Sequence, residues 1–404
     1  MKKISLVLIA LLLIAGSLFA QGAAEETTKS DALKVALICI GDENDQGYTF
    51  NFVKGQREAT EKLAAEGIDV EWIFKYNIPE TSACQDANIE AAEEGAEIVF
   101  NNSFGFEPHM LEVAPEYADV KFVGCTNSAS GTDDLPNTYN AFANIYEGRY
   151  VAGVLAGMKL NELIADGTIT AEEAVIGYVG AYSFAEVISG FTSYYLGARS
   201  VCPSVTMKIN FVGSWHDATA ESDAALALID EGAVLVSQHS DTTTPATAAQ
   251  SRGKFHTGYN ADMSEVAPEA SIIGTRIDWS VYFYDFIKAH LAGEEFVQDW
   301  AGGLKEGAVV LTPLNEAIAA EGSAEAMADT IAKISDGTIK VFDTSKFTVG
   351  GKELTSAFAV DTDGDFAADT HEAVFEGAFH ESHFQSAPYF TAQIDGIKWL
   401  NAAY

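Results

Sequence analysis

Aromatic and polar residues recur in the loops that follow the short apolar runs of this chain. Aromatic side chains pack on the faces of small molecules, and carboxylates and amides hydrogen-bond their edges or, in enzymes, transfer protons. The candidate residues, in chain order, are Asp45, Tyr48, Asn102, Phe104, Phe184, Trp215, Gln238, Asp241, Tyr259 and Asp278. We expect these side chains to form one small-molecule binding site.

Each candidate also has a purely structural interpretation. A single Tyr or Phe near the end of a strand usually packs against the neighbouring helix. Asp45, Asp217 and Asp278 each precede a predicted helix, where Asp is a favoured N-cap residue. The residues alone leave open which of these side chains meet a ligand.

The candidates follow strand-like apolar runs that alternate with long amphipathic stretches, the pattern of β-α-β units around parallel sheets. The first five runs begin near Lys34, Asp69, Glu97, Lys121 and Tyr139. The second five begin near Val175, Thr206, Ala233, Lys254 and Ser271. The similar spacing of the two sets indicates an internal repeat. The sequence therefore predicts an α/β protein with two Rossmann-like lobes, each built on a parallel sheet, joined by a hinge.

Two such lobes enclose a cleft, and ligands of open parallel sheets bind beyond the carboxyl ends of the strands. All ten candidates lie in loops at these ends, so we expect them to converge there. The expected divisions of the chain are a signal peptide at 1–20, a flexible lead-in at 21–32, lobe 1 at 33–142 with a return segment at 276–305, lobe 2 at 143–275, and a C-terminal segment at 306–404 that completes the hinge and one lobe flank.

The beginning of the chain predicts export. Lys2 and Lys3 precede an apolar stretch at residues 4–15, and small residues follow up to Ala20, which is the pattern of a cleaved secretory signal peptide. No cysteine occurs before Cys39, so we expect no lipid-anchored cysteine near the new N-terminus. The predicted location is the periplasm.

The composition excludes some partners. The chain has 59 Asp and Glu residues against 23 Lys and Arg residues, and the resulting net charge of -36 makes nucleic acid a poor partner. The four cysteines show no CxxC spacing and are Cys39, Cys84, Cys125 and Cys202. We expect buried thiols, with a single disulfide as the alternative in an oxidising compartment.

Catalytic and metal-binding motifs are weak in this sequence. It contains no GxSxG, HExxH, Walker A or GxGxxG motif. The segment DTDGDFAADTHE at 361–372 has the acidic spacing of a calcium loop, but Phe366 occupies the position that requires glycine. His371, His380 and His383 lie in an acidic tail, where exposure is more common than metal binding. We therefore expect no catalysis, no metal and no cofactor.

Several motifs resemble the basic membrane protein family, the exported solute receptors of ABC importers. They are DQGYTFNFVKGQREA from Asp45, SFGF at 103–106, YEGRYVAGVLAG at 146–157, Ser214-Trp215 with Asp217, and QHSDT with YNADMS. The resemblance covers roughly residues 33 to 345. It implies the type I periplasmic-binding-protein fold and a purine nucleoside or purine base as the ligand.

Within that family the chain is similar to a branch in which two aromatic residues hold the purine base, here Tyr48 and Trp215. Relatives in that branch have Trp in place of Tyr48 and Asn-Trp in place of Asp278-Trp279. An ionised Asp only accepts hydrogen bonds, whereas Asn donates and accepts them. Asp278 therefore predicts a preference for guanine-type edges, which present two adjacent donors. The segment from about Phe347 onward lies outside the resemblance.

The resemblance implies a monomeric receptor that closes on a purine nucleoside or base and delivers it to the membrane permease of an ABC importer. Two alternatives stay open. One is an exported nucleoside-hydrolase-like enzyme that uses Asp45, Asp217 or Asp241 as acid or base. The other is a receptor for a sugar or other small metabolite, because a fold does not determine its ligand.

Overall fold

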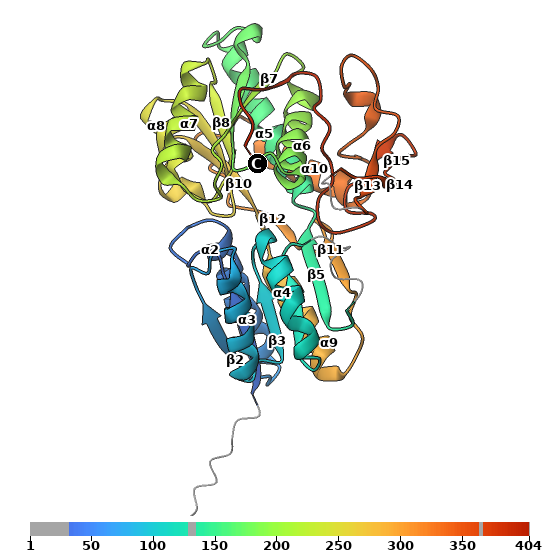
Figure 1. Cartoon of the computed structure of the whole chain (residues 1–404). Helices are drawn as coiled ribbons and strands as arrows, with labels where there is room; N and C mark the ends of the chain where they lie inside the picture. Colours follow the sequence, from blue (N-terminus) through green and yellow to red (C-terminus); the bar gives the residue numbers. More distant parts are fainter. Residues whose placement is uncertain (1–31, 128–134, 363–366, 404) are drawn as a thin grey trace, which may run out of the picture.

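The computed structural model describes residues 32–127, 135–362 and 367–403. The predicted signal peptide and all but the last residue of the predicted lead-in lie outside the described residues, as does the centre of the segment 361–372. Figure 1 shows two lobes, one above the other, with each sheet covered by helices. The α/β fold class with parallel-dominated sheets is as predicted from the sequence.

Lobe 1 is built on a six-stranded parallel sheet, drawn in the lower half of Figure 1. Its strands, in spatial order, are β11 (Asp299–Gly302), β5 (Thr138–Ala143), β4 (Lys121–Gly124), β3 (Ile98–Asn101), β1 (Leu33–Ile38) and β2 (Val70–Lys75). Its helices are α2 (Tyr48–Ala65), α3 (Ser82–Glu93), α4 (Glu107–Val113) and α9 (Trp279–Ala292). Phe52 of α2 packs edge-on against Trp279 and Phe283 of α9, which ties the returning helix to the lobe 1 core.

Lobe 2 is built on a seven-stranded sheet in which only the edge strand β12 runs antiparallel to its neighbour, among the described residues. Its strands, in spatial order, are β12 (Val309–Leu311), β10 (Ser271–Ile277), β9 (Phe255–Tyr259), β8 (Leu235–His239), β6 (Val175–Gly180), β7 (Thr206–Phe211) and β17 (Ile397–Trp399). Its helices are α5 (Ile145–Ala165), α6 (Ala185–Val201), α7 (Ala218–Asp230), α8 (Thr244–Ser251) and α10 (Ser323–Ser335). Short 3-10 helices are η1 (Phe104–Phe106), η2 (Ala114–Glu116), η4 (Ala171–Glu173), η5 (Met263–Glu265) and η6 (Thr344–Lys346).

The ten strands predicted from apolar runs all begin within two residues of their predicted starts. Their central strands read as continuous apolar runs because they are buried on both faces; β3, for example, is buried at every position. The two alanine-rich helices α3 and α7 end just before Gly95 and Gly232, which adopt φ values of 91° and 102°. Such left-handed conformations favour glycine and stop a helix before the next strand.

Helices α5 and α6 pack closely against one another in lobe 2. A Cβ atom added at Gly153 would lie 2.0 Å from the carbonyl oxygen of Tyr194, and one added at Gly197 would lie 2.1 Å from that of Tyr150. Only glycine allows the two backbones to approach this closely. The glycines of the YEGRYVAGVLAG segment therefore seat α5 on α6, which carries part of the site described below.

The chain crosses between the lobes three times in its first 311 residues. It passes from β5 to α5, from β10 to α9, and from β11 to β12. Several connections side by side act as a hinge that lets two lobes rotate relative to one another.

The sequence patterns predict no individual strands in the region after α10. It forms two small hairpins, β13 (Phe358–Val360) with β14 (Thr370–Glu372) and β15 (Val374–Phe375) with β16 (Ala378–Phe379), before β17 joins the edge of the lobe 2 sheet. The hairpins lie at the side of lobe 2 in Figure 1. Phe342 and Phe390 stack at a ring-centroid distance of 4.6 Å within the lobe 2 core.

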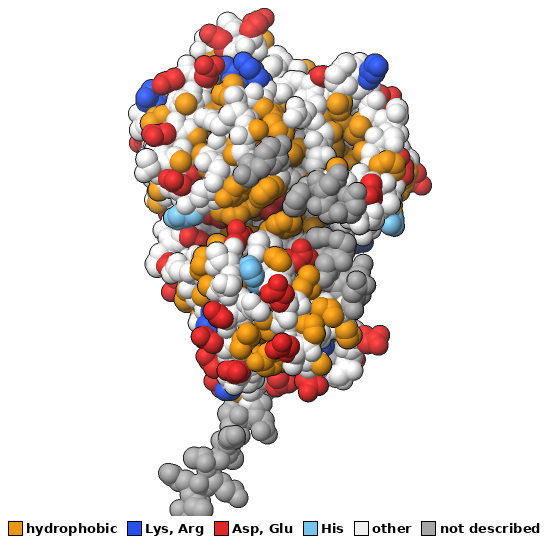
Figure 2. Space-filling view, in the orientation of Figure 1, with side chains coloured by type: hydrophobic (Ala, Val, Ile, Leu, Met, Phe, Trp, Pro, Cys, Tyr) orange, Lys and Arg blue, Asp and Glu red, His pale blue; other side chains and the backbone are white. Residues whose placement is uncertain are grey.

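Acidic side chains are spread over both lobes on the face drawn in Figure 2, and Lys and Arg side chains are fewer. All four cysteines are buried and free, so no disulfide forms between them. Within the described parts of the chain, no helix combines the length and the apolar character needed to cross a membrane.

Candidate ligand-binding site

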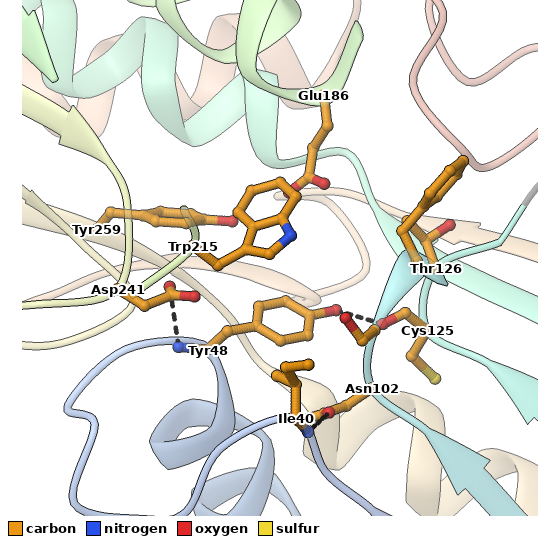
Figure 3. Close-up of a pocket in the computed structure, with 11 residues that line it drawn as sticks. Ile40, Tyr48, Asn102, Cys125, Thr126, Glu186, Trp215, Asp241 and Tyr259 are labelled. Carbon is orange, nitrogen blue, oxygen red and sulfur yellow. Dashed lines mark hydrogen bonds between the residues drawn. The ribbon is translucent and has the colours of Figure 1, made fainter. Parts of the chain in front are cut away.

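A cavity lies between the two lobes at the carboxyl ends of their strands (Figure 3). Lobe 1 lines it with Ile40, Tyr48, Asn102, Ser103, Phe104, Cys125 and Thr126. Lobe 2 lines it with Glu186, Trp215, Asp241 and Tyr259. The empty space between these side chains, including the open solvent at its mouth, is about 400 Å³.

Tyr48 is the first residue of α2 and reaches across the lobe 1 side of the cavity. Its hydroxyl donates a hydrogen bond of 2.7 Å to the carbonyl oxygen of Cys125, at the end of β4. Its ring stacks on Phe52 and meets Trp279 edge-on, at centroid distances of 6.3 and 6.0 Å. Both the ring and the hydroxyl are therefore held in place before any ligand arrives.

Asn102 follows β3 and links the loop after β1 to the first turn of α2. Its Oδ1 accepts a hydrogen bond of 2.8 Å from the backbone N–H of Ile40, and its Nδ2 donates to the Oγ1 of Thr49 at 3.3 Å. Because both ends of the amide are engaged, Asn102 shapes the cavity wall more than it offers free hydrogen-bonding groups.

Trp215 follows β7 and faces Tyr48 across the cavity in Figure 3. Its ring packs against Tyr182 and Phe184, at centroid distances of 5.3 and 6.3 Å. Phe184 in turn lies 6.2 Å from the ring of Phe104, which belongs to lobe 1. This aromatic contact joins the lobes at the mouth of the cavity.

Asp241 connects the two lobes through the first turn of α2. Helix α2 has Gly47 at its N-cap position, and Asp45 caps the N–H groups of Thr49 and Phe50 in its first turn. The N–H of Tyr48 donates a hydrogen bond of 3.1 Å to the Oδ1 of Asp241, which belongs to the opposite lobe. No hydrogen bond joins the Oδ2 of Asp241 to the part of the chain that the structure describes. Asp241 thus caps a helix across the cleft while one of its oxygens borders the cavity.

The backbones of the two lobes also approach closely here. A Cβ atom added at Gly47 would lie 2.4 Å from the Cβ and 2.6 Å from the carbonyl oxygen of Asp241. Burial, together with the negative charges of Asp45, Glu221 and Glu186, raises the pKa of the Asp241 carboxyl well above its ordinary value. When the two lobes lie this close, the surroundings of the Asp241 carboxyl favour its neutral form, unless a ligand donates a hydrogen bond to it.

Glu186 is a second half-engaged carboxylate on the lobe 2 side. Its Oε1 lies 3.1 Å from the Nε2 of His239, and burial lowers the pKa of that imidazole. Tyr259 lies between His239 and Arg149, with the Arg149 guanidinium 4.0 Å from its ring centroid. The Tyr259 hydroxyl is buried and has no hydrogen-bond partner among the described residues.

The structure brings together six of the ten predicted residues around the cavity and places a seventh, Phe184, against its rim. The six are Tyr48, Asn102, Phe104, Trp215, Asp241 and Tyr259. The other three lie elsewhere. Gln238 is buried beneath the loop, where its Nε2 donates to the carbonyl oxygens of Ser240 and Thr242.

Asp45 and Asp278 do not border the cavity. Asp45 accepts hydrogen bonds from the backbone N–H groups of Gly47, Thr49 and Phe50, which occupies both of its oxygens. Asp278 caps α9 by accepting from the N–H and the hydroxyl of Ser280, at 3.1 and 2.6 Å. The position of Asp278 therefore does not support its predicted role in reading the ligand edge.

Five lining residues were not among the candidates: Ile40, Ser103, Cys125, Thr126 and Glu186. Thr126 lies directly after β4, and Glu186 lies in the first turn of α6 after β6, so the same positional rule could have selected them. Ile40 and Cys125 contribute an apolar side chain and a strand-end backbone, for which the sequence carries no distinguishing signal.

The geometry is that of a binding site. Of the acids in the hydrolase hypothesis, Asp45 is fully engaged by backbone N–H groups and Asp217 caps α7 through Thr219 and Ala220. Only Asp241 of that set borders the cavity. Within the described residues there is no group of three or more His, Cys, Asp or Glu side chains that could hold a metal ion.

Comparison with known proteins agrees with this geometry. A family model described as ABC transporter substrate-binding protein PnrA-like matches residues 32–344. A purine-binding protein of Brucella abortus is 33% identical over 308 residues, which cover 76% of this chain and 80% of that protein. A putative ABC transporter glucose-binding protein of Haloferax volcanii is 31% identical over 220 residues, 54% of this chain and 52% of that protein.

Among solved structures, a solute-binding protein of an ABC transporter system from Aeropyrum pernix K1 has the same fold. Its TM-score is 0.62 at 20% sequence identity, over 83% of this chain and 95% of that one. Members of the matched family are extracytoplasmic solute-binding proteins that bind small molecules and work with ABC permeases, and they are not enzymes. The protein described here belongs to this family of PnrA-like ABC transporter substrate-binding proteins.

Proposed function

We propose that this protein is a monomeric periplasmic receptor that binds a purine base or purine nucleoside between Tyr48 and Trp215 and presents it to an ABC permease. The observation that carries the proposal is the pair of aromatic side chains that face one cavity from opposite lobes. Stacking on an aromatic side chain contributes roughly 1 to 3 kcal/mol per base. The Brucella relative named as purine-binding supports the same ligand class.

The polar groups of the cavity favour a ligand with N–H or O–H donors. Asp241 and Glu186 each engage the protein through one oxygen only. Carboxylate oxygens accept hydrogen bonds, and guanine, hypoxanthine or the hydroxyls of a ribose supply the matching donors. The donor preference that the sequence suggested for Asp278 is thus reassigned to these two carboxylates.

The same lining argues against phosphorylated ligands. Among the residues that the structure describes, no Lys or Arg side chain lines the cavity, whereas two acidic side chains do. A phosphate group would therefore meet two acidic side chains and, within the described lining, no cation to balance its charge in a partly closed site. We expect purine bases and nucleosides to bind and the corresponding nucleotides to fail.

A thermal-shift panel followed by calorimetry tests the proposal. The panel comprises purine bases, purine nucleosides, their monophosphates, pyrimidines and simple sugars. A true ligand at a hundredfold excess over its Kd stabilises the protein by about 2.7 kcal/mol. Stabilisation by sugars alone would favour the glucose-receptor alternative that the Haloferax relative suggests. Release of free base from a nucleoside would contradict the receptor function.

A further inference from the structure

The C-terminal extension, residues 345–404, follows the stretch matched by the family model, which ends at residue 344. Its described part is nonetheless firmly attached to lobe 2. Strand β17 pairs with β7, and Tyr389, Phe390 and Ile394 are buried in the lobe 2 core. The extension is therefore an integral part of lobe 2 and moves with it.

Ser386 of the extension forms hydrogen bonds with lobe 1. Ser386 is 2% exposed, and its backbone N–H donates a hydrogen bond of 2.9 Å to the Oδ2 of Asp299 on β11. Its hydroxyl donates a hydrogen bond to the Oδ1 of Asp299 and accepts one of 2.8 Å from the Nδ2 of Asn140 on β5. The Nδ2 of Asn140 also donates a hydrogen bond of 3.0 Å to the Oδ1 of Asp299. Ser386 therefore forms a link between the lobes that is separate from the three chain crossings.

The link continues from Asn140 to the ligand cavity. The Oδ1 of Asn140 accepts a hydrogen bond of 2.6 Å from the N–H of Asn127 and one of 3.3 Å from the hydroxyl of Thr126. Thr126 and Cys125 line the cavity, and the carbonyl oxygen of Cys125 holds the hydroxyl of Tyr48. The Asn140 amide has its donor end on Ser386 and Asp299 and its acceptor end on the 125–127 loop, which determines its orientation.

We propose that the C-terminal extension is part of the ligand-binding apparatus, with Ser386 as a positioning residue. Through Asn140 it holds the 125–127 loop in its cavity-forming place, and through Asp299 it holds lobe 2 in the closed arrangement. The extension thus couples closure of the lobes to the wall that supports Tyr48. The proposal rests on the cavity being the ligand site, as in the proposed function, whichever purine occupies it.

Full-length Ser386→Ala tests the proposal against a matched control. Ser356→Ala is the control, because Ser356 also lies in the extension and its hydroxyl also donates to a carboxylate, Glu372, but it is exposed and contacts only the extension. Loss of a buried hydrogen bond to a charged group weakens an interaction by about tenfold. We expect Ser386→Ala to bind the best purine of the panel about tenfold more weakly, through faster dissociation. Ser356→Ala should bind like the parent.

Rescue by Ser386→Thr, which keeps the hydroxyl, separates positioning from general packing. Asp299→Asn provides a second variant that keeps the side-chain size, in case Ser386→Ala does not fold. If each folded variant dissociates ligand at the rate of the parent, the proposal is wrong.

Small-angle scattering of the ligand-free proteins gives a readout that needs no ligand. We expect a larger radius of gyration for Ser386→Ala than for the parent and Ser356→Ala. If no purine binds the parent, the proposed ligand fails, while the scattering comparison still decides whether the extension holds the lobes together. Equal radii of gyration for all three proteins would overturn the proposal.

Discussion

The two walls of the cavity differ in how their polar groups are used. On the lobe 1 wall, the hydroxyl of Tyr48 and both ends of the Asn102 amide are engaged by other parts of lobe 1. On the lobe 2 wall, Asp241 and Glu186 each engage the protein through one oxygen, and the Tyr259 hydroxyl has no partner among the described residues. Tyr48 and Asn102 of the lobe 1 wall are thus engaged within their own lobe, whereas the lobe 2 wall keeps hydrogen-bonding capacity for a partner.

This difference assigns separate tasks to the two lobes. A wall with satisfied polar groups keeps its shape in the open and closed forms alike, and it supplies an apolar platform. A buried acceptor or hydroxyl without a partner is costly, so the lobe 2 wall becomes favourable to close only when a ligand supplies the missing hydrogen bonds. Lobe 1 therefore provides shape, and lobe 2 provides selection.

The largest effect is expected for Asp241→Ala. It removes an oxygen that borders the cavity and also the cap that α2 receives from the opposite lobe. We expect a loss of roughly 2 to 4 kcal/mol of purine binding free energy, measured by calorimetry. Asp217→Ala is the matched control, since Asp217 caps α7 within lobe 2 alone. Equal affinity in the two variants would contradict a special role for Asp241.

The aromatic pair should give the next largest effect. Trp215→Ala and Tyr48→Ala should each lose roughly 1 to 3 kcal/mol of binding free energy, because each removes one stacking face. Tyr48→Phe keeps the face and removes only the bond to Cys125, so its affinity should stay within about 1 kcal/mol of the parent. A larger loss in Tyr48→Phe than in Tyr48→Ala would mean that the phenol, not the ring, meets the ligand.

The raised pKa of Asp241 predicts a pH dependence of stability. In the folded, closed form this carboxyl binds its proton more tightly than in the unfolded chain. Stability contributed by the group is therefore greatest below its ordinary pKa and is lost as pH rises toward the raised pKa. Asp241→Asn removes this titration, so the ligand-free parent should lose stability relative to the variant as pH rises from about 4. Parallel denaturation midpoints of the two proteins across this range would exclude the effect.

The smallest effect is expected at Asp278, which lies outside both walls. Asp278→Ala should lose about 1 kcal/mol of folding free energy, because it removes the cap on Ser280 at the start of α9. Purine affinity and the preference among purines should be those of the parent. A changed preference in this variant would restore the sequence-based hypothesis that Asp278 reads the ligand edge.

The amino-acid sequence by itself determined the ten strands of the repeated α/β units and the edge at which the site lies. Those features depend on local order, because short apolar runs that alternate with long amphipathic stretches indicate the buried strands of β-α-β units. The positional rule also selected Tyr48 and Trp215, which border the cavity. It selected Asp45 and Asp278 by the same rule, although both cap helices.

Only the tertiary structure decided which carboxylate faces the cavity. Asp45 and Asp241 both follow strands, yet Asp45 is captured by N–H groups within five residues, whereas Asp241 caps a helix 193 residues away in the chain. The seating of β17 in the lobe 2 sheet and of Ser386 on lobe 1 are likewise contacts between distant segments. Such contacts depend on how two lobes meet, and no local pattern of residue types encodes that meeting.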